Sequence, residues 1–139
     1  MKTKKTPHPG AHSLEFFPVK KITAFAVVQS KVIIHPHTGG YKIPIVPGSL
    51  IPDVQEEEAE GGTVYRINHT FNIAFNCLEN EQQLKVYAGQ EMIATYMNET
   101  GQRVVSGTQQ NPLTFSYIPV SGNYNCKLSG VTREPEAFL

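Results

Sequence analysis

An alternation of side chains over residues 63–77 constrains the fold more than any other feature of this sequence. One set of alternate positions is mainly apolar and consists of Tyr65, Ile67, His69, Phe71, Ile73, Phe75 and Cys77. The positions between them are mainly polar and consist of Val64, Arg66, Asn68, Thr70, Asn72, Ala74 and Asn76. A period of two predicts a β-strand with one buried side and one side toward water. At about 3.3 Å per residue the strand spans roughly 50 Å, so we expect it to pair with several neighbours or to project past its sheet.

Shorter runs of the same kind predict further strands along the chain. They lie at residues 19–29, 31–34, 84–88, 91–96, 103–106, 113–118 and 124–129, with strand fragments at 41–46. Both sides of 19–29 are apolar, which favours a strand covered on both faces. Residues 97–102 have the composition of a hairpin turn, and no run of helical period exceeds about two turns. The predicted fold class is therefore all-β, an antiparallel β-sandwich or small β-barrel.

Composition divides the chain into an arm and a single domain. Residues 1–14 contain Lys, Pro, Gly and His without a strand pattern, so we expect a mobile N-terminal arm. Residues 15–139 are expected to form one β domain, because a chain of 139 residues buries enough surface for one core. Within it, residues 35–52 are expected to form a long Pro-rich loop, and residues 55–62 an acidic, flexible turn.

Two segments carry more apolar surface than a solvated loop or tail requires. The Pro-rich loop contains Tyr41, Ile43 and Ile45, and it either folds back over the sheet or docks on another subunit. The C-terminal tail ends on Phe138 and Leu139, which either pack on the parent domain or act as a docking tag. Both alternatives stay open on the sequence alone.

The charge balance and hydropathy argue against several classes of partner. Lys plus Arg and Asp plus Glu number 12 each, so the formal net charge is zero and specific nucleic-acid binding is not expected. No run of about 18 apolar residues occurs, and the N-terminus lacks the apolar segment of a secretory signal. We therefore expect neither a membrane partner nor export by that route. Cys77 and Cys126 lie in strand patterns and are expected to be reduced core thiols.

No group of residues has the spacing of a catalytic or metal site. His35 and His37 lie in the Pro-rich loop without an acidic or Cys partner at a metal-binding spacing, so no cofactor is expected. His69 is the polar residue on the apolar face of the long strand, which favours a hydrogen-bonded core histidine over a catalytic base. Neither a GxSxG turn nor a Gly-rich phosphate loop occurs, so we expect no enzyme. A small β-barrel enzyme would need a pocket around His69 with Tyr65 or Tyr87.

The order of strands and turns within residues 63–131 has a parallel among known proteins. The hairpin turn NETGQR is followed by a strand that ends near SGT, then by NPLTF and a final strand with NCKLSG. This order resembles small virion proteins of tailed bacteriophages. The resemblance implies a β-sandwich or β-barrel subunit of the head-tail connector, tail completion or tail tube type, in which arms and loops exchange between neighbours. It carries over no site residue.

These features predict a structural virion component, made in the host cytoplasm, that assembles into a homo-oligomeric ring or tube. Its partners would be further copies of itself and neighbouring virion proteins. The residues expected at subunit contacts are Lys2, Lys4, Lys5, Tyr41, Ile43, Ile45, Phe138 and Leu139. The alternative is a non-catalytic β-sandwich binding module of a bacterial surface or carbohydrate-associated assembly.

Overall fold

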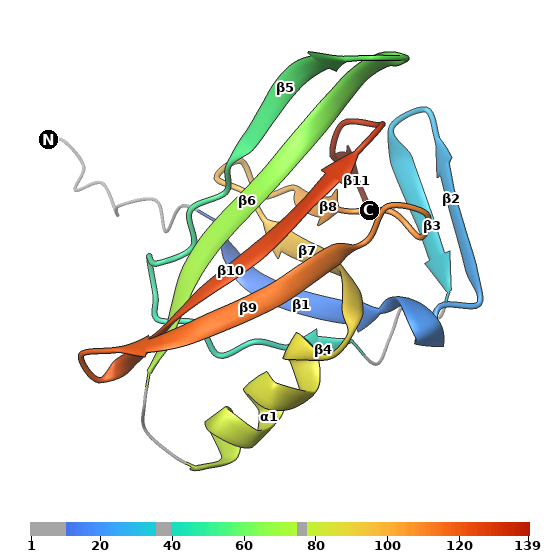
Figure 1. The fold of residues 1–139 in the computed structure, drawn as a ribbon. Helices are drawn as coiled ribbons and strands as arrows, with labels where there is room; N and C mark the ends of the chain where they lie inside the picture. Colours follow the sequence, from blue (N-terminus) through green and yellow to red (C-terminus); the bar gives the residue numbers. More distant parts are fainter. Residues whose placement is uncertain (1–10, 36–39, 75–77) are drawn as a thin grey trace, which may run out of the picture.

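The computed structural model describes residues 11–35, 40–74 and 78–139, the side chains of 78–80 excepted. Within these residues eleven strands form one mixed sheet, accompanied by a single α-helix (Figure 1). The expectation of a β-rich domain is therefore confirmed. The elements are β1 (His12–Pro18), the 3₁₀ turn η1 (Val19–Lys21), β2 (Ala24–Val28), β3 (Lys31–His35), β4 (Tyr41–Lys42), β5 (Val54–Ala59), β6 (Gly62–Ala74), α1 (Leu78–Ala88), β7 (Glu91–Met97), β8 (Arg103–Ser106), β9 (Leu113–Val120), β10 (Asn123–Thr132) and β11 (Ala137–Phe138).

The strands are neighbours in the order β2-β3-β11-β8-β7-β9-β10-β6-β5. Strand β1 pairs with β7 on one side and with the short β4 on the other. All these pairs are antiparallel except the contact between β11 and β3, which is parallel, so the purely antiparallel sheet that we expected needs this correction. The path through the sheet begins at β2 and ends at β5.

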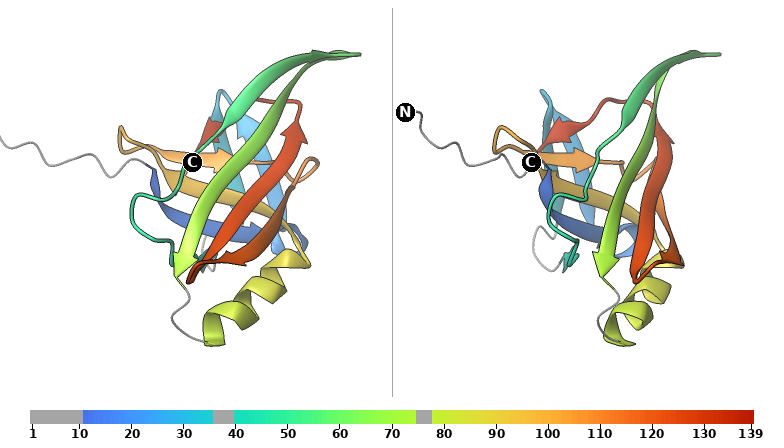
Figure 2. Two further views of the ribbon diagram at one scale, coloured as in Figure 1. Left: turned by 60° about the vertical axis from the view of Figure 1, so that its left-hand side comes forward. Right: turned by 90° about the vertical axis from the view of Figure 1, so that its left-hand side faces the viewer.

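Strand β6 is the long alternating strand that the sequence predicts. It pairs with β10 from Tyr65 to Ala74 and with β5 from Gly62 to Ile67, so it serves two neighbours. Ile67, His69, Phe71 and Ile73 are buried, as the alternation requires. The β5–β6 hairpin extends well beyond the rest of the sheet (Figure 2), which confirms the expected overhang. The last three residues of the predicted strand, 75–77, lie outside the described residues.

Two apolar cores lie on opposite sides of β7. Phe16, Phe71 and Phe115 belong to the larger core, which Met92 and Ala94 of β7 also enter. The smaller core lies under the β2–β3 hairpin and consists of Phe17, Ile22, Val32, Ile34, Ile93, Val105 and Ala137. The strand covered on both faces is therefore β7, in which five consecutive residues from Met92 to Tyr96 are buried.

Residues 19–29 are not one strand with two covered faces. The chain forms η1, then β2, and returns as β3 through a tight turn in which Gln29 and Ser30 both have positive φ angles. Phe25 and Val27 face the smaller core, whereas the other side of β2 is exposed. The apolar outer side of β2 is therefore part of the protein surface, and β2 also lies at one end of the sheet path.

Residues 78–88 form helix α1, where we expected a strand at 84–88. Leu84 and Tyr87 are buried, and the residues between them, Lys85 and Val86, are exposed. A spacing of three places both buried side chains on one helix face, over the end of the larger core. A five-residue apolar piece does not distinguish this pattern from a strand.

The acidic segment at 55–62 is also regular structure, not a flexible turn. Residues Val54–Ala59 pair with β6 along their whole length, and a two-residue turn at Glu60 and Gly61 leads into Gly62 of β6. Gly61 and Gly62 both have positive φ angles. Pairing with the long strand β6 thus holds residues 54–59 in a strand, although their acidic composition alone is typical of a solvated loop.

The arm predicted at residues 1–14 overlaps the domain. Strand β1 begins at His12, and Ala11 and Leu14 are buried in the larger core. The described part of the predicted arm, residues 11–14, therefore belongs to the folded domain. Leu14 lies two positions before Phe16 on β1, and both side chains are buried in the larger core. Residues 1–10 lie outside the described residues.

Candidate functional site

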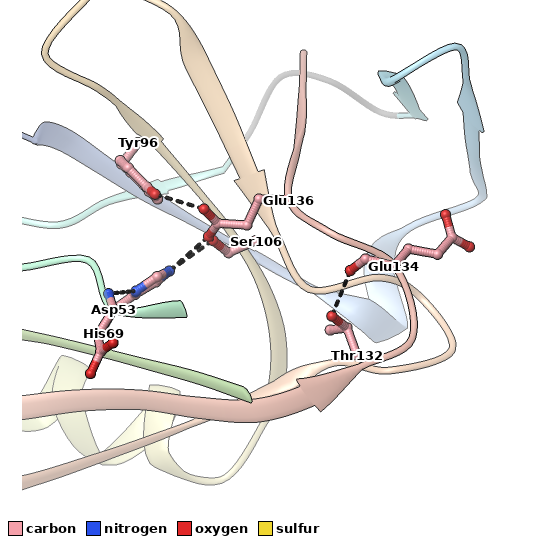
Figure 3. A network of polar contacts seen from close by, with 7 residues as sticks. All are labelled: Asp53, His69, Tyr96, Ser106, Thr132, Glu134 and Glu136. Atoms are coloured by element: carbon pink, nitrogen blue, oxygen red, sulfur yellow. Dashed lines mark hydrogen bonds and ion pairs between the residues drawn. The ribbon is translucent and has the colours of Figure 1, made fainter. Parts of the chain in front are cut away.

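A buried polar cluster joins β6, β7, β8 and the C-terminal segment (Figure 3). His69 is completely buried, and its Nε2 lies 2.8 Å from Ser106 Oγ and 2.9 Å from Glu136 Oε2. Ser106 also hydrogen-bonds the same carboxylate oxygen, and Tyr96 donates its hydroxyl to the other oxygen at 2.9 Å. We call His69, Tyr96, Ser106 and Glu136 the polar cluster.

The hydrogen bonds of His69 define its tautomer. The backbone N–H of Asp53 donates to His69 Nδ1 at 3.0 Å, so Nδ1 carries no proton. The proton of the neutral ring is then on Nε2, which donates toward Glu136 and Ser106. In a nucleophile-base-acid triad the acid orients the base through one nitrogen while the nucleophile meets the other. Here the hydroxyl and the carboxylate share one nitrogen, so the cluster is built for anchoring and not for proton relay to a nucleophile.

Tyr96 remains a hydrogen-bond donor to the cluster. Burial raises the pKa of the Tyr96 hydroxyl, and the nearby Glu136 carboxylate raises it further. Its ring packs edge-on against the His69 ring, with centroids 5.4 Å apart. Tyr96, rather than the expected Tyr65 or Tyr87, is therefore the tyrosine beside the core histidine.

The polar cluster holds the C-terminal segment in place. Directly after Glu136, Ala137 is buried and Phe138 pairs with Val104 of β8 and Lys31 of β3. Strand β11 thereby joins the β2–β3 hairpin to the rest of the sheet. The apolar tail packs on its own domain through Phe138, whereas Leu139 remains 44 % exposed.

The expected contact residues of the Pro-rich loop mostly face inward. Ile43 is buried, and Tyr41 and Ile45 are partly buried against the larger core. Tyr41 also accepts a hydrogen bond from Lys21 Nζ at 2.7 Å and packs against Tyr87, with ring centroids 5.3 Å apart. In Figure 1, β4 lies at the lower end of the domain and β11 at its upper right, so the structure does not bring the loop and tail residues together.

Backbone hydrogen bonds tie the same loop to two strands. The N–H of Ile43 donates to the carbonyl of Leu14 in β1, and the N–H of Val46 donates to the carbonyl of Asn72 in β6, at 2.9 and 2.8 Å. A bridge between Ile51 and Thr70 adds a third connection. The part of this segment from Ile43 to Ile51 is therefore hydrogen-bonded to β1 and β6 of its own domain. Lys2, Lys4 and Lys5 lie outside the described residues.

The outer face of the β2–β3 hairpin is an exposed apolar surface, which sequence reasoning missed. Ala24, Ala26 and Val28 are exposed on β2, and Ile33, which lies opposite Ala26, is 49 % exposed. We call these four residues the hairpin face. Gln29 and Ser30 are not residues that favour the positive φ angles of a tight hairpin turn, so the sequence carries little signal for a hairpin here.

The opposite end of the sheet carries negative charge. Glu56, Glu57 and Glu58 follow one another on β5, and Glu57 forms an ion pair with Arg66 Nε at 2.9 Å. This hydrogen-bonded pair lowers the pKa of Glu57 and raises that of Arg66. Glu56 and Glu58 form no ion pair with any described residue.

Several open hollows lie on the described surface, and two of them are large. One of about 640 Å³ lies between α1 and the β4 region and is lined by Tyr41, Lys42, Gln82 and Tyr87 among others. The second, of about 490 Å³, lies over the outer side of β6, β10 and β9, and is lined by Thr70, Asn72, Tyr117, Ile118, Asn125 and Lys127 among others. Neither hollow contains a member of the polar cluster.

Cys126 is a buried thiol that we expect to be unreactive in the native protein. Burial raises its pKa from 9.0 to about 12, which lowers the thiolate fraction at pH 8 by roughly a thousandfold. In a Cys77→Ser variant, an aromatic disulfide reagent should therefore modify Cys126 at least a hundredfold more slowly in buffer than in denaturant. Equal rates in the two solvents would contradict the burial of this thiol.

The described residues bring together no group of three or more His, Cys, Asp or Glu side chains that could hold a metal ion. They also include no helix with the length and apolar character that crossing a bilayer requires. No family model, no curated protein and no solved structure matches the chain.

Proposed function

We propose that this chain is a structural virion component of a tailed bacteriophage, which assembles as a homo-oligomeric ring or tube at the head-tail junction or in the tail. The observation that carries the proposal is a sheet whose two end strands, β2 and β5, each pair with only one strand among the described residues, and one of them lies on a hairpin that overhangs the domain. Open edges are templates for strand pairing between chains, and proteins that remain single usually cover or shorten them. A subunit that assembles by strand pairing could use both end strands, β2 and β5, as contacts with neighbouring copies.

The described hydrogen bonds favour a small β-barrel as the subunit's architecture. Strands β1, β7, β9, β10 and β6 are neighbours in that order, and the Pro-rich loop connects β6 back to β1 through Val46 and Ile43. Closure of this path into a barrel leaves none of its strands with an unpaired edge. Strand β7 is then a barrel strand that is buried on both faces. The β2–β3 hairpin and β5 then remain as the strands available for partners.

Removal of residues 1–10 is expected to weaken assembly and to leave the melting temperature of the isolated subunit, measured at a concentration where it is monomeric, within about 2 °C of the full chain. The reason is that Lys2, Lys4 and Lys5 are proposed contact residues, whereas the described core begins at Ala11. Light scattering and thermal unfolding of the truncated protein check the two halves of this prediction. Removal of residues 1–14 is the matched comparison, because it also deletes buried Leu14 and should lower the melting temperature by at least 5 °C. Normal assembly of the shorter truncation would contradict a role for the arm.

The location of the protein tests the proposed function. Antibodies against the chain, applied to purified particles of the phage that encodes it, should label the tail or the head-tail junction in electron micrographs. Mass spectrometry of the same particles should find the protein in many copies. Absence of the protein from purified particles would overturn the proposal.

The hollow over β6, β10 and β9 favours a binding module as the second candidate. Tyr117 lies there among the amide and hydroxyl groups of Asn72, Asn125 and Ser116, a combination suited to sugars. Binding on a glycan array that is lost on Tyr117→Ala, with no particle association, would favour this alternative.

A further inference from the structure

The two open strands of the sheet are chemically unlike. Strand β2 is wholly apolar, and within the described residues it pairs only with β3. Strand β5 carries three consecutive carboxylates, and the described part of the chain pairs it only with β6. The strands are five and six residues long, so one could pair with the other along its whole length.

Cations lie at both ends of β2. Lys20 precedes the strand in η1, and Lys31 lies on β3 opposite Val28; both are exposed and form no ion pair with described residues. On β5, Glu56 and Glu58 share one side because they are two positions apart. Since Arg66 neutralises Glu57, these two carboxylates are the ones that remain for a partner.

We propose that β5 of one copy adds to the open edge of β2 in the next copy, so that the sheet continues from subunit to subunit. The inference rests on the proposed function and specifies the contact that builds the ring or tube. Main-chain hydrogen bonds between the strands supply affinity, and the attraction of Glu56 and Glu58 for Lys20 and Lys31 selects the partner strand.

The position of the two strands makes the contact head-to-tail. They are at the two ends of the sheet path, and in Figure 1 β2 borders the right of the domain while β5 lies beyond β6. A contact between two different surfaces leaves one of each kind free at the ends, so copies add until a ring closes or a tube grows. The hairpin face lies beside the joined strand and is partly covered in the process, as is a hollow of about 180 Å³ beside Phe25, Ala26 and Val27.

Charge exchange between the two edges tests the contact. One variant, Glu56→Lys with Glu58→Lys, reverses the β5 edge; a second, Lys20→Glu with Lys31→Glu, reverses the β2 edge. All four positions are exposed, so each variant should unfold at the temperature of the wild-type monomer when the samples are dilute enough to be monomeric. Each variant alone places like charges across the contact, and its dissociation constant should rise at least tenfold. An equimolar mixture of the two variants restores opposite charges at every contact and should assemble like the wild type, as should the chain with all four substitutions.

Analytical ultracentrifugation of these samples separates the possible results. Assembly of the β5 variant by itself would show that β5 is not at the contact, and assembly of the β2 variant by itself would show the same for β2. Failure of the mixture to assemble would overturn the pairing of these two edges. If the wild type is oligomeric and present in particles while both variants assemble normally, this contact is wrong and the proposed function stands. Absence from particles removes the proposed function, whatever the variants do.

Amide hydrogen exchange tests the strand pairing apart from the charges. Outward-facing N–H groups of β2 should exchange at least tenfold more slowly in the wild-type oligomer than in the monomeric β5 variant. Amides of β7, which are buried in either state, provide the internal control. Equal exchange in β2 would overturn the continued sheet.

Discussion

Replacing Phe16 by alanine is expected to lower the free energy of unfolding by about 3–5 kcal/mol. Phe16 is fully buried on β1, and its ring meets those of Tyr87, Phe115 and Phe71 at centroid distances of 5.3, 5.6 and 6.3 Å. These aromatic residues come from four separate elements, so a cavity at this point removes contacts among all of them. Urea unfolding followed by circular dichroism measures the loss.

Phe25→Ala is the matched control for Phe16→Ala. It removes the same atoms from a partly exposed position at the border of the smaller core, and it should cost about half as much or less. Equal losses for the two variants would contradict the central place of Phe16 in the larger core.

Replacing Glu136 by alanine is expected to lower the free energy of unfolding by about 3 kcal/mol. The substitution leaves His69 Nε2–H, the Tyr96 hydroxyl and the Ser106 hydroxyl without their carboxylate partner in a buried site. It also releases the strand that follows, so the amides of Ala137 and Phe138 should lose protection against exchange. Urea unfolding and amide exchange provide the two readings.

Glu134→Ala controls for the loss of a carboxylate from the same segment. The Glu134 side chain is exposed, and its contact with Thr132 is through the backbone carbonyl, which the substitution retains. Its effect should stay within about 0.5 kcal/mol. A Glu136→Ala variant as stable as Glu134→Ala would show that the polar cluster does not anchor the C-terminal segment.

The sequence predicted those strands and turns in which the alternation of apolar and polar residues, or the turn residues themselves, determine the local structure. The alternation in β6 and β10 is visible in the sequence, because each of these strands has one face toward water. The turn between β7 and β8 is visible because it contains Asn98 and Gly101. The same reasoning failed for α1. Leu84 and Tyr87 are three positions apart and both pack into the larger core, and this shared burial favours a helix only in the folded protein. The reasoning also failed for β5, since a strand of carboxylates is ordered by its neighbour β6 and not by its composition.

The polar cluster shows why the remaining features could not be predicted. A core histidine at position 69 was expected, but its partner Glu136 is 67 positions further along the chain, in a tail without a strand pattern. Nothing in the local sequence separates Glu136 from exposed Glu134. Likewise, whether β2 or β7 is covered on both sides depends on which strand lies in the middle of the sheet, and that is a property of the topology.

The mass of the purified protein in solution tests the central claim most directly. Multi-angle light scattering over a wide concentration range, with electron microscopy of the largest species, measures self-assembly on the purified chain alone. A subunit that continues its sheet into the next copy should exceed the monomer mass of 15.4 kDa as concentration rises, and it should reach a ring of constant size or a growing tube. A folded protein that keeps the monomer mass at every concentration would contradict self-assembly through the open strands.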